Sequence, residues 1–436
     1  MDNYDVNELM QFMNENITAY HAIENISNEL GAKGFCEFCE KEIWNISKGE
    51  KGYCIRNGSS LIAFKIPYVS VDAIKGFHIF AAHADSPAFK IKENPEMTKE
   101  GVYVCLNTEK YGGMIMNTWL DRPLTIAGRV CVLEDGDIKS YNVKLKDNIC
   151  MIPNLAIHMN IDVNSGVALN AQTDMLPLIT MISDEDENKF SLNRLLAEEL
   201  NIKLNKKYSE EDILASDIFI ENCQKAVLAG ANDEFIMTPR YDDLACVFAG
   251  LKSFEASESD KYIDVLAVFD NEEVGSLTRQ GADSTFLKDT LENIADGIGI
   301  DARIFRTWKA DSFMISADNA HACHPNQAGK ADPVNKPYLN KGIVLKYHGG
   351  QKYATDAYSS AFVKRICKEE NIPYQIYTNR SDIAGGSTLG NLSMAQVSMA
   401  AADIGLPQLA MHSSYETAGV KDMDYMIKLV KRFFEI

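Results

Sequence analysis

The N-terminal part of the chain carries apolar residues first at helical spacing and then in short runs. Apolar positions within Val6–Leu30 recur every three or four residues, which predicts one or two amphipathic helices that stop at Gly31. Ser60–Ile66 has the composition of a strand, and Phe77–Ala82 is a short apolar run of the kind found in buried parallel strands.

From about Glu93 to Asn232 the pattern changes to short strand-like segments. Leu124–Leu133 is rich in branched residues, Glu134–Asp137 has the composition of a turn, and Ile138–Leu145 returns with alternating polarity. This order predicts a β-hairpin. We therefore expect a separate β-rich domain over residues 93–232.

After Asp233 the chain alternates between strand and helix patterns, which predicts a mostly parallel sheet covered by helices on both faces. The predicted elements are a helix at Leu244–Phe254, a strand at Tyr262–Phe269, a strand at Phe313–Ala317, a helix at Ala354–Ile372, a strand at Leu406–Met411 and a helix at Met423–Phe434. The N-terminal strands share this character. The expected fold is thus α/β, with a discontinuous domain of residues 1–92 and 233–436 and the β-rich domain inserted between its halves.

Charge and composition exclude several classes of partner. The 436 residues carry a formal net charge of −19, which repels phosphate backbones and anionic lipid, so we expect no nucleic acid and no membrane partner. No apolar run approaches the length of a membrane span, and the N-terminus lacks the pattern of a signal peptide. The ten scattered cysteines fit free thiols in a reducing compartment, so a cytoplasmic location is expected. Cys36 and Cys39 form a lone CxxC without the second pair that a zinc ribbon needs.

Polar side chains follow several of the apolar strands directly. His83 and Asp85, the pair Glu272 and Glu273, then Asp318 and finally His412 all stand where a predicted strand ends. In open α/β sheets, ligands bind at the carboxyl ends of the strands.

Asp242 precedes a predicted helix and joins this set, although Asp243 is an equally plausible choice from the pattern. Two imidazoles and several carboxylates without a thiolate suit zinc, cobalt or manganese in a hydrolytic site. The alternatives are ordinary: a packed histidine, a helix cap at Asp242 and a solvated turn at Glu272 and Glu273. Adjacent carboxylates after a strand repel each other unless a cation or a proton intervenes, which favours the metal site.

Longer segments around these residues resemble the aspartyl aminopeptidase family, whose members are exopeptidases with two metal ions. The similar segments occur in the family's order and span nearly the whole chain. They are Ala82–Pro87, Asn117–Leu124, Ile152–His158, Asp270–Ser276, Asp318–His321 with His324–Asn326, Ser387–Gly390 and Pro407–Ser413. The resemblance implies a catalytic domain of the zinc-exopeptidase type, an inserted dimerisation domain and hydrolysis of N-terminal residues from peptides.

The resemblance also implies roles for the strand-end residues. Asp242 would bridge two divalent ions, with His83 and Asp318 completing one site and Glu273 and His412 the other. Zinc is the expected metal, with cobalt and manganese as alternatives. Glu272 would be the general base.

Asp85 would hold the ring of His83 from the side away from the metal. The expected proton route runs from a water molecule to Glu272 and then to the leaving amine.

Two further residues match family features outside the metal set. His158 matches a histidine that reaches the active site of a neighbouring subunit, and Lys346 matches a lysine that contacts an acidic substrate side chain. Their alternatives are a packed histidine and an exposed strand lysine. The family assembles as a dodecamer, so a large homo-oligomer is expected, with the inserted domain making most of the contact.

The chain departs from the family in two loops near the expected substrate pocket, at Arg380–Gly385 and at Ser413–Glu416. The resemblance implies a preference for N-terminal Asp or Glu, and because these two loops differ, an aminopeptidase that prefers neutral residues such as Leu is the alternative. A deacylase or carboxypeptidase with two metals, and a non-catalytic assembly protein, are the remaining alternatives.

Overall fold

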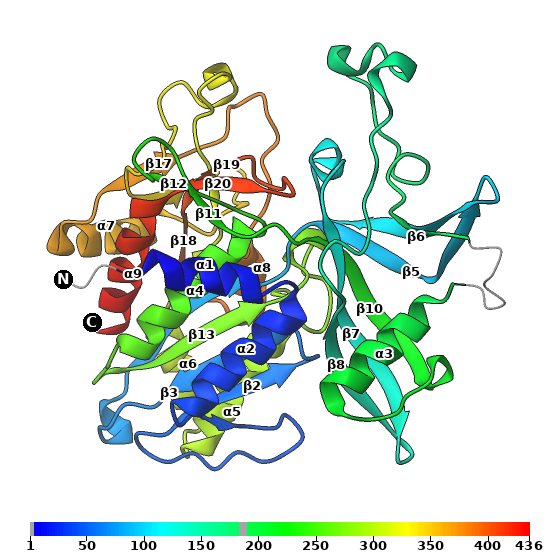
Figure 1. The fold of residues 1–436 in the computed structure, drawn as a ribbon. Coiled ribbons are helices and arrows are strands. Elements are labelled where there is room, and N and C mark those ends of the chain that lie inside the picture. Colours follow the sequence, from blue (N-terminus) through cyan, green and yellow to red (C-terminus); the bar gives the residue numbers. More distant parts are fainter. Residues whose placement is uncertain (1–3, 183–189) are drawn as a thin grey trace. The chain divides into compact units, whose positions relative to one another are not determined.

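The computed structural model describes residues 4–182 and 190–436, which fold into two compact units (Figure 1). Of the described residues, the first unit contains 4–85, 226–411 and 416–436, and the second contains 86–182, 190–225 and 412–415. The two long boundaries lie at 85/86 and 225/226, whereas the sequence pattern predicts them at 92/93 and 232/233. Following the expectation from the sequence, the first unit is named the catalytic unit and the second the inserted unit.

A nine-stranded sheet forms the centre of the catalytic unit. In spatial order its strands are β1 (Cys36–Glu37), β2 (Lys51–Arg56), β3 (Ser60–Lys65), β13 (Tyr262–Phe269), β4 (Gly76–His83), β14 (Phe313–Ala317), β18 (Ala400–Gly405), β16 (Ile343–Lys346) and β17 (Tyr374–Tyr377). The predicted strands at Tyr262–Phe269 and Phe313–Ala317 have the bounds expected from the sequence.

The sheet is mixed, with its longest parallel part in the middle. The strands β13, β4, β14 and β18 run parallel, whereas β3 pairs with β13, and β16 with β18, in antiparallel orientation. The central strands are buried on both faces, which explains why they appear as continuous apolar runs in the sequence. The outermost pairs, β1 with β2 and β16 with β17, are also parallel, so the sheet is mostly parallel as predicted, with antiparallel pairs on either side of its centre.

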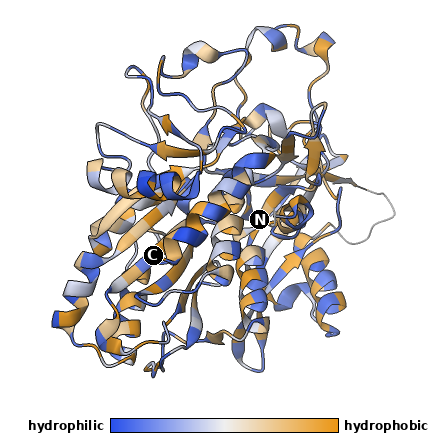
Figure 2. Ribbon diagram, turned by 90° about the vertical axis from the view of Figure 1, so that its left-hand side faces the viewer, coloured by the Kyte–Doolittle hydropathy of each residue, from blue (hydrophilic) through white to orange (hydrophobic). Residues whose placement is uncertain are grey.

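Helices cover both faces of this sheet, and alternate residues of each strand face the two layers. In β4, for example, Phe80 and Ala82 belong to one apolar core, and Ile79 and Ala81 belong to the other. One layer contains α1 (Val6–Glu15), α2 (Ala19–Ala32), α4 (Tyr241–Ala256), α7 (Ala357–Glu370) and α9 (Val420–Phe434). The other contains α5 (Phe286–Gly297), α6 (Ala302–Asp311) and α8 (Leu389–Val397). The helices carry both hydrophobic and hydrophilic stretches, as expected when one face packs on a sheet (Figure 2).

A second, five-stranded sheet also belongs to the catalytic unit. Its strands, in spatial order, are β11 (Val227–Ala229), β12 (Phe235–Thr238), β20 (Glu416–Gly419), β19 (Pro407–Leu409) and β15 (Ala320–His321). The strand β15 follows Asp318 closely, and β19 continues the chain from β18. This small sheet therefore connects the segment after Asp318 to the strand that begins at Glu416.

The inserted unit is built on a six-stranded antiparallel sheet with one helix, α3 (Leu192–Leu204). In spatial order its strands are β8 (Asp137–Lys144), β7 (Leu124–Glu134), β10 (Ile213–Asn222), β5 (Ala88–Lys99), β6 (Tyr103–Tyr111) and β9 (Leu178–Met181). The predicted hairpin is present as β7 and β8, which pair from Glu134 opposite Asp137. The two residues between them, Asp135 and Gly136, both have positive φ, as the tight hairpin turn requires.

All ten cysteines are free thiols, and Cys36 and Cys39 are exposed. Over the described residues, no helix is both long enough and apolar enough to cross a membrane.

Candidate metal centre

His83 is the last residue of β4 and is almost completely buried. Its Nδ1 lies 3.1 Å from the backbone oxygen of Asp85 and 3.3 Å from Asp85 Oδ1, and its Nε2 lies 3.7 Å from Asp242 Oδ1. Acceptors on the Nδ1 side hold a proton there and leave the Nε2 lone pair for another partner. A histidine that binds a metal through Nε2 needs this tautomer.

Asp85 holds the neighbouring acidic turn as well as the histidine. Its Oδ1 accepts a hydrogen bond from the backbone N–H of Glu272, and its Oδ2 accepts one from the N–H of Glu273, both at 3.1 Å. These two residues begin the short 3-10 helix η6 (Glu272–Val274), which follows β13 after the residue Asn271 with positive φ. One carboxylate thus fixes the ends of two adjacent parallel strands.

Asp242 lies at the start of α4 with extended rather than helical backbone angles. Its backbone N–H donates to Glu416 Oε2 at 3.0 Å, so β20 supports the aspartate from the small sheet. The neighbouring Asp243 is directed elsewhere, because its Oδ2 accepts from the backbone N–H of His83 at 3.4 Å. The sequence left these two aspartates undecided, and Asp242 is the one whose carboxylate approaches the imidazole Nε2.

Asp318 directly follows β14, the strand next to β4, and its backbone N–H donates to the backbone oxygen of Ile404 in β18. The Asp318 carboxylate lies close to His83 and Asp242. One possible ligand atom from each of these three residues lies within 4.8 Å of the other two. His83, Glu272 and Glu273 form a second such group.

The site carries far more negative than positive charge. Six carboxylates surround His83, and they belong to Asp85, Asp242, Asp243, Glu272, Glu273 and Asp318. Burial, together with the charges of Asp318, Asp85 and Asp242 and against the opposing effect of His83, raises the pKa of Glu272 to about 8. Burial and the charge of Asp242 raise the pKa of Glu273 well above its usual range.

The imidazole responds in the opposite direction. Burial alone would lower the pKa of His83, but its hydrogen bond to Asp85 and the charges of Asp243 and Glu272 raise the pKa well above its usual range. The carboxylates therefore favour positive charge at this position. A divalent cation would supply that charge more effectively than a proton on the imidazole. Nitrogen and oxygen donors of this kind fit zinc.

Lys346, at the end of β16, contacts this set through Asp318. Its Nζ donates to the backbone oxygens of Asp318 and Asn319 at 3.0 and 2.9 Å, and it lies 3.2 Å from Asp318 Oδ2. The side chain is only 3 % exposed, so the alternative of an exposed strand lysine is wrong. Burial alone would lower the pKa of Lys346, but the negative charge of Asp318 outweighs it and raises the pKa.

The chain matches the model of the family described as aminopeptidase I zinc metalloprotease (M18) over residues 12–434. The chain belongs to the M18 family. It is 43% identical over 432 residues to a probable M18 family aminopeptidase 2 of Clostridium novyi, with 99% of this chain and 98% of that protein covered. It is 35% identical over 447 residues to aspartyl aminopeptidase 1 of Schizosaccharomyces pombe, with 98% and 94% covered.

Solved structures share the fold. The chain superposes with a TM-score of 0.94 on a protein in the cryo-EM structure of the Ape4 and Nbr1 complex, at 34% identity and with 100% and 87% of the chains covered. It superposes with a TM-score of 0.84 on the S. cerevisiae mApe1 dodecamer, at 27% identity and with 98% and 95% covered. This M18 protein is accordingly an aminopeptidase, a hydrolase of the zinc metalloprotease type, as the sequence predicts.

Two of the predicted site residues of this aminopeptidase lie in the inserted unit. His412 directly follows Met411, the last residue of its segment in the catalytic unit, and its Nδ1 lies 2.8 Å from the backbone oxygen of Gly113. His158 is exposed on the 3-10 turn η3 (Ile157–Met159). The roles expected of both residues stay predictions.

Several polar residues that support the site escaped the sequence analysis. Asn319 donates from Nδ2 to the backbone oxygen of Tyr241 at 2.9 Å and to Gln408 Oε1 at 3.0 Å, and the Gln408 amide lies 3.3 Å from Glu416 Oε1. Together with the bond from Asp242 to Glu416, these contacts lock the start of α4 to the small sheet. Their signal in the sequence is a polar residue within an apolar strand or directly beside a strand-end ligand.

Proposed function

We propose that this aminopeptidase removes acidic N-terminal residues from peptides and that two divalent ions, most simply zinc, serve the reaction. His83 and Asp318 would hold one ion, Glu273 and His412 the other, and Asp242 would bridge them. The observation that carries the proposal is the concentration of six buried or half-buried carboxylates around His83, one of which, that of Asp318, lies 3.2 Å from the ammonium of Lys346. A pair of divalent ions, when bound, lowers the pKa of water and polarises the scissile carbonyl.

His412 is included in the proposal because it directly follows Met411, the last residue of its segment in the catalytic unit. One peptide bond joins the two residues, so their Cα atoms are about 3.8 Å apart. The contact of His412 Nδ1 with the oxygen of Gly113 favours a proton on that nitrogen and leaves Nε2 for coordination. Both histidines of the proposed site thus share one arrangement, with a backbone oxygen behind the ring.

Glu272 is the proposed general base and acid. Asp85 fixes the backbone of Glu272 and of its neighbour Glu273. In the proposal Glu273 binds a metal ion, and Glu272 transfers the proton. The Glu272 carboxylate would take a proton from the attacking water and deliver it to the amine that leaves. A carboxylate whose charged form is disfavoured by burial is well suited to hold that proton between the two steps.

The proposed acidic preference depends on Lys346. Its ammonium currently has Asp318 as counter-ion, together with two backbone oxygens. A cation held by Asp318 would weaken that ion pair and make the ammonium available to a substrate carboxylate. The name of the Schizosaccharomyces pombe relative, aspartyl aminopeptidase 1, supports the same preference.

Self-association is part of the proposal. The segment around His158 exposes a series of apolar side chains, namely Leu155, Ile157, Met159 and Ile161, each at least half exposed. Exposed apolar residues in such number are typical of a surface that is covered by a partner. The S. cerevisiae mApe1 neighbour is a dodecamer, and we propose that this chain also forms a large homo-oligomer in which His158 reaches the site of another copy.

The test is a set of initial rates for the metal-loaded enzyme on free-amine substrates that begin with Asp, Glu, Leu or Lys, with N-acetyl-Asp as the control. A preference for Asp and Glu and no cleavage of the acetylated substrate are expected. A preference for Leu would contradict the acidic specificity and keep the aminopeptidase reaction. Cleavage of the acetylated substrate alone would instead favour a deacylase.

A further inference from the structure

Asp403 is a completely buried carboxylate in the middle of the central sheet of the catalytic unit. It stands in β18 directly beside Ser316 of β14, two residues before the metal-site residue Asp318. On its other side the register between β18 and β16 runs through Leu345 opposite Ile404, so Lys346 falls opposite Asp403. Ser316, Asp403 and Lys346 thus form a polar row across three adjacent strands.

The Asp403 carboxylate binds groups from two loops that come from distant parts of the sequence. Its Oδ1 accepts from the hydroxyls of Ser316 and Thr388, both at 2.7 Å, and its Oδ2 accepts from the backbone N–H of Ala354 at 2.5 Å. Its own N–H donates to the hydroxyl of Thr355 at 2.8 Å. The loop after β16 and the loop after β17 are therefore both anchored on one side chain.

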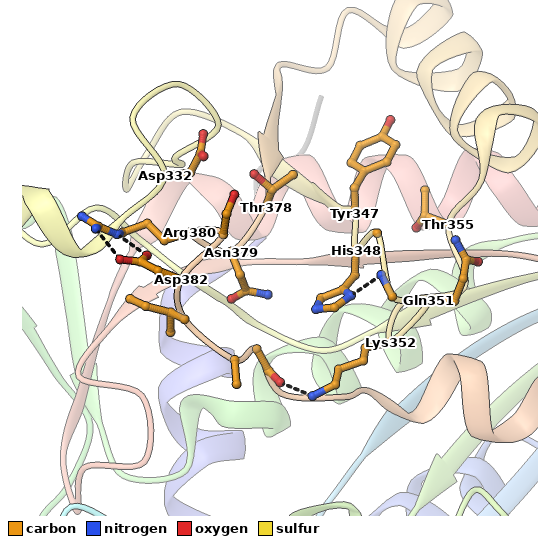
Figure 3. Close-up of a pocket in the computed structure, with 16 residues that line it drawn as sticks. Asp332, Tyr347, His348, Gln351, Lys352, Thr355, Thr378, Asn379, Arg380 and Asp382 are labelled. Atoms are coloured by element: carbon orange, nitrogen blue, oxygen red, sulfur yellow. Dashed lines mark hydrogen bonds and ion pairs between the residues drawn. The ribbon is translucent and has the colours of Figure 1, made fainter.

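These two loops form the walls of a cavity of about 860 Å³, which is lined by residues 347–352 and 378–385 together with Asp332 and Thr355 (Figure 3). Lys352 joins the walls to each other by donating to the backbone oxygen of Gly385 at 2.6 Å. Each wall is followed within a few residues by a contact with Asp403. The wall of residues 347–352 is followed by Ala354 and Thr355, and the wall of residues 378–385 is followed by Thr388.

The first of these loops also covers Lys346. The ring centre of Tyr353, the residue before Ala354, lies 5.0 Å from Lys346 Nζ. The hydrogen bond from the Ala354 N–H to Asp403 therefore fixes the position of the Tyr353 ring relative to the Lys346 ammonium. Thr388 occupies the N-cap position of α8, and its hydroxyl binds Asp403 instead of the helix. Gly390 in the first turn of α8 leaves room for Asp403, because a Cβ there would lie 2.7 Å from Asp403 Oδ1.

We propose that Asp403 is a positioning residue for substrate selection: it fixes both walls of this cavity and the Tyr353 cover of Lys346, and so sets which N-terminal side chain the enzyme accepts. This inference rests on the proposed function, since it assigns the selection of the substrate side chain to Lys346 and its surroundings. Asp403 itself touches no reacting atom.

Three variants test this role. Asp403→Ala removes the anchor. Asp403→Asn keeps it, because the amide oxygen can accept from Ala354 while the hydroxyls of Ser316 and Thr388 turn to accept from the amide N–H groups. Asp422→Ala is the matched control, since Asp422 is equally buried and holds the backbone N–H groups of the loop that precedes β16.

The first readout is hydrogen exchange of the peptides that cover residues 348–356 and 379–389, which does not require activity. Faster exchange is expected in both peptides for Asp403→Ala and wild-type exchange for Asp422→Ala. The second readout is the ratio of kcat/KM for an Asp substrate to that for a Leu substrate. We expect this ratio to change at least tenfold in Asp403→Ala, mainly through KM, and less than threefold in Asp403→Asn and Asp422→Ala.

Wild-type exchange in both peptides of Asp403→Ala would overturn the positioning role. An unchanged ratio, or an equal change in Asp422→Ala, would overturn its part in substrate selection. If Asp403→Asn were as damaging as Asp403→Ala, charge rather than position would be the cause. A wild-type enzyme that cleaves neither substrate would refute the proposed function, and the exchange data would still decide whether Asp403 anchors the loops.

Discussion

Replacing Asp85 with asparagine disturbs three contacts of the candidate metal centre at once. The carboxylate accepts from the backbone N–H groups of Glu272 and Glu273 through different oxygens and lies beside His83 Nδ1. An asparagine offers one acceptor oxygen, so its amide N–H₂ must face one of the two backbone N–H groups. At least one charge-assisted hydrogen bond is lost, and two donors are brought against each other.

The size of the effect follows from these contacts. A hydrogen bond to a charged group contributes about 1.5–3 kcal/mol, which corresponds to roughly a 10- to 150-fold change in an equilibrium constant. Groups that orient metal ligands from behind have effects of about 10- to 100-fold on metal affinity or activity. We therefore expect Asp85→Asn to require about 10- to 100-fold more free zinc for half-maximal aminopeptidase activity.

The assay is a zinc titration of the metal-free enzyme in a metal buffer, followed by the initial rate on an unblocked substrate. Asp422→Asn is the control, because Asp422 also accepts two backbone N–H groups, from Asn340 and Gly342, in the same unit. A wild-type titration midpoint for Asp85→Asn would refute the orienting role of Asp85. An equal shift for Asp422→Asn would trace the effect to general loss of stability.

Three further outcomes are expected. Glu272→Gln should lower kcat by at least a thousandfold with unchanged zinc content; full activity in this variant would exclude Glu272 as the base. Lys346→Met should lower kcat/KM for Asp substrates by more than tenfold and that for Leu substrates by much less, and an equal loss for both would point to Asp318 instead. Burial lowers the pKa of His78 from 6.5 to about 3, so the unfolded chain binds a proton that the folded one does not as the pH falls below 6.5, and stability is lost in that range. Between pH 7 and pH 5, urea unfolding of the wild type should lose about 2 kcal/mol more than that of His78→Phe, whereas the exposed control His324→Gln should behave as the wild type.

The sequence predicted the central strands well because they are buried on both faces and therefore appear as uninterrupted apolar runs. Tyr262–Phe269 is the clearest case, and the polar residues after such runs led directly to His83, Glu272 and Asp318. The choice between Asp242 and Asp243 could not be made in this way, because adjacent residues share every local signal. Their backbone directions and the distant Glu416 decide it.

Contacts between distant segments account for the rest of what the sequence did not predict. Asp403 lies in a short strand, Ala400–Gly405, which has no strong strand pattern, and its partners come from three other parts of the chain. The burial of Lys346 likewise depends on where Asp318 and Tyr353 are placed. The sequence did not identify which pairs of the sheet are antiparallel, such as β3 with β13 and β16 with β18, because periodicity within a strand carries no information about the direction of its neighbour.

The most direct test of the proposed metal centre is the activity of the metal-free enzyme as measured equivalents of zinc are added. Two ions per chain are predicted, so the rate on a free-amine substrate should rise until two equivalents are bound and then stay constant. His83→Ala and Asp242→Asn should abolish this rise. Full activity without metal, or full activity with a single equivalent bound, would contradict the proposed two-metal centre.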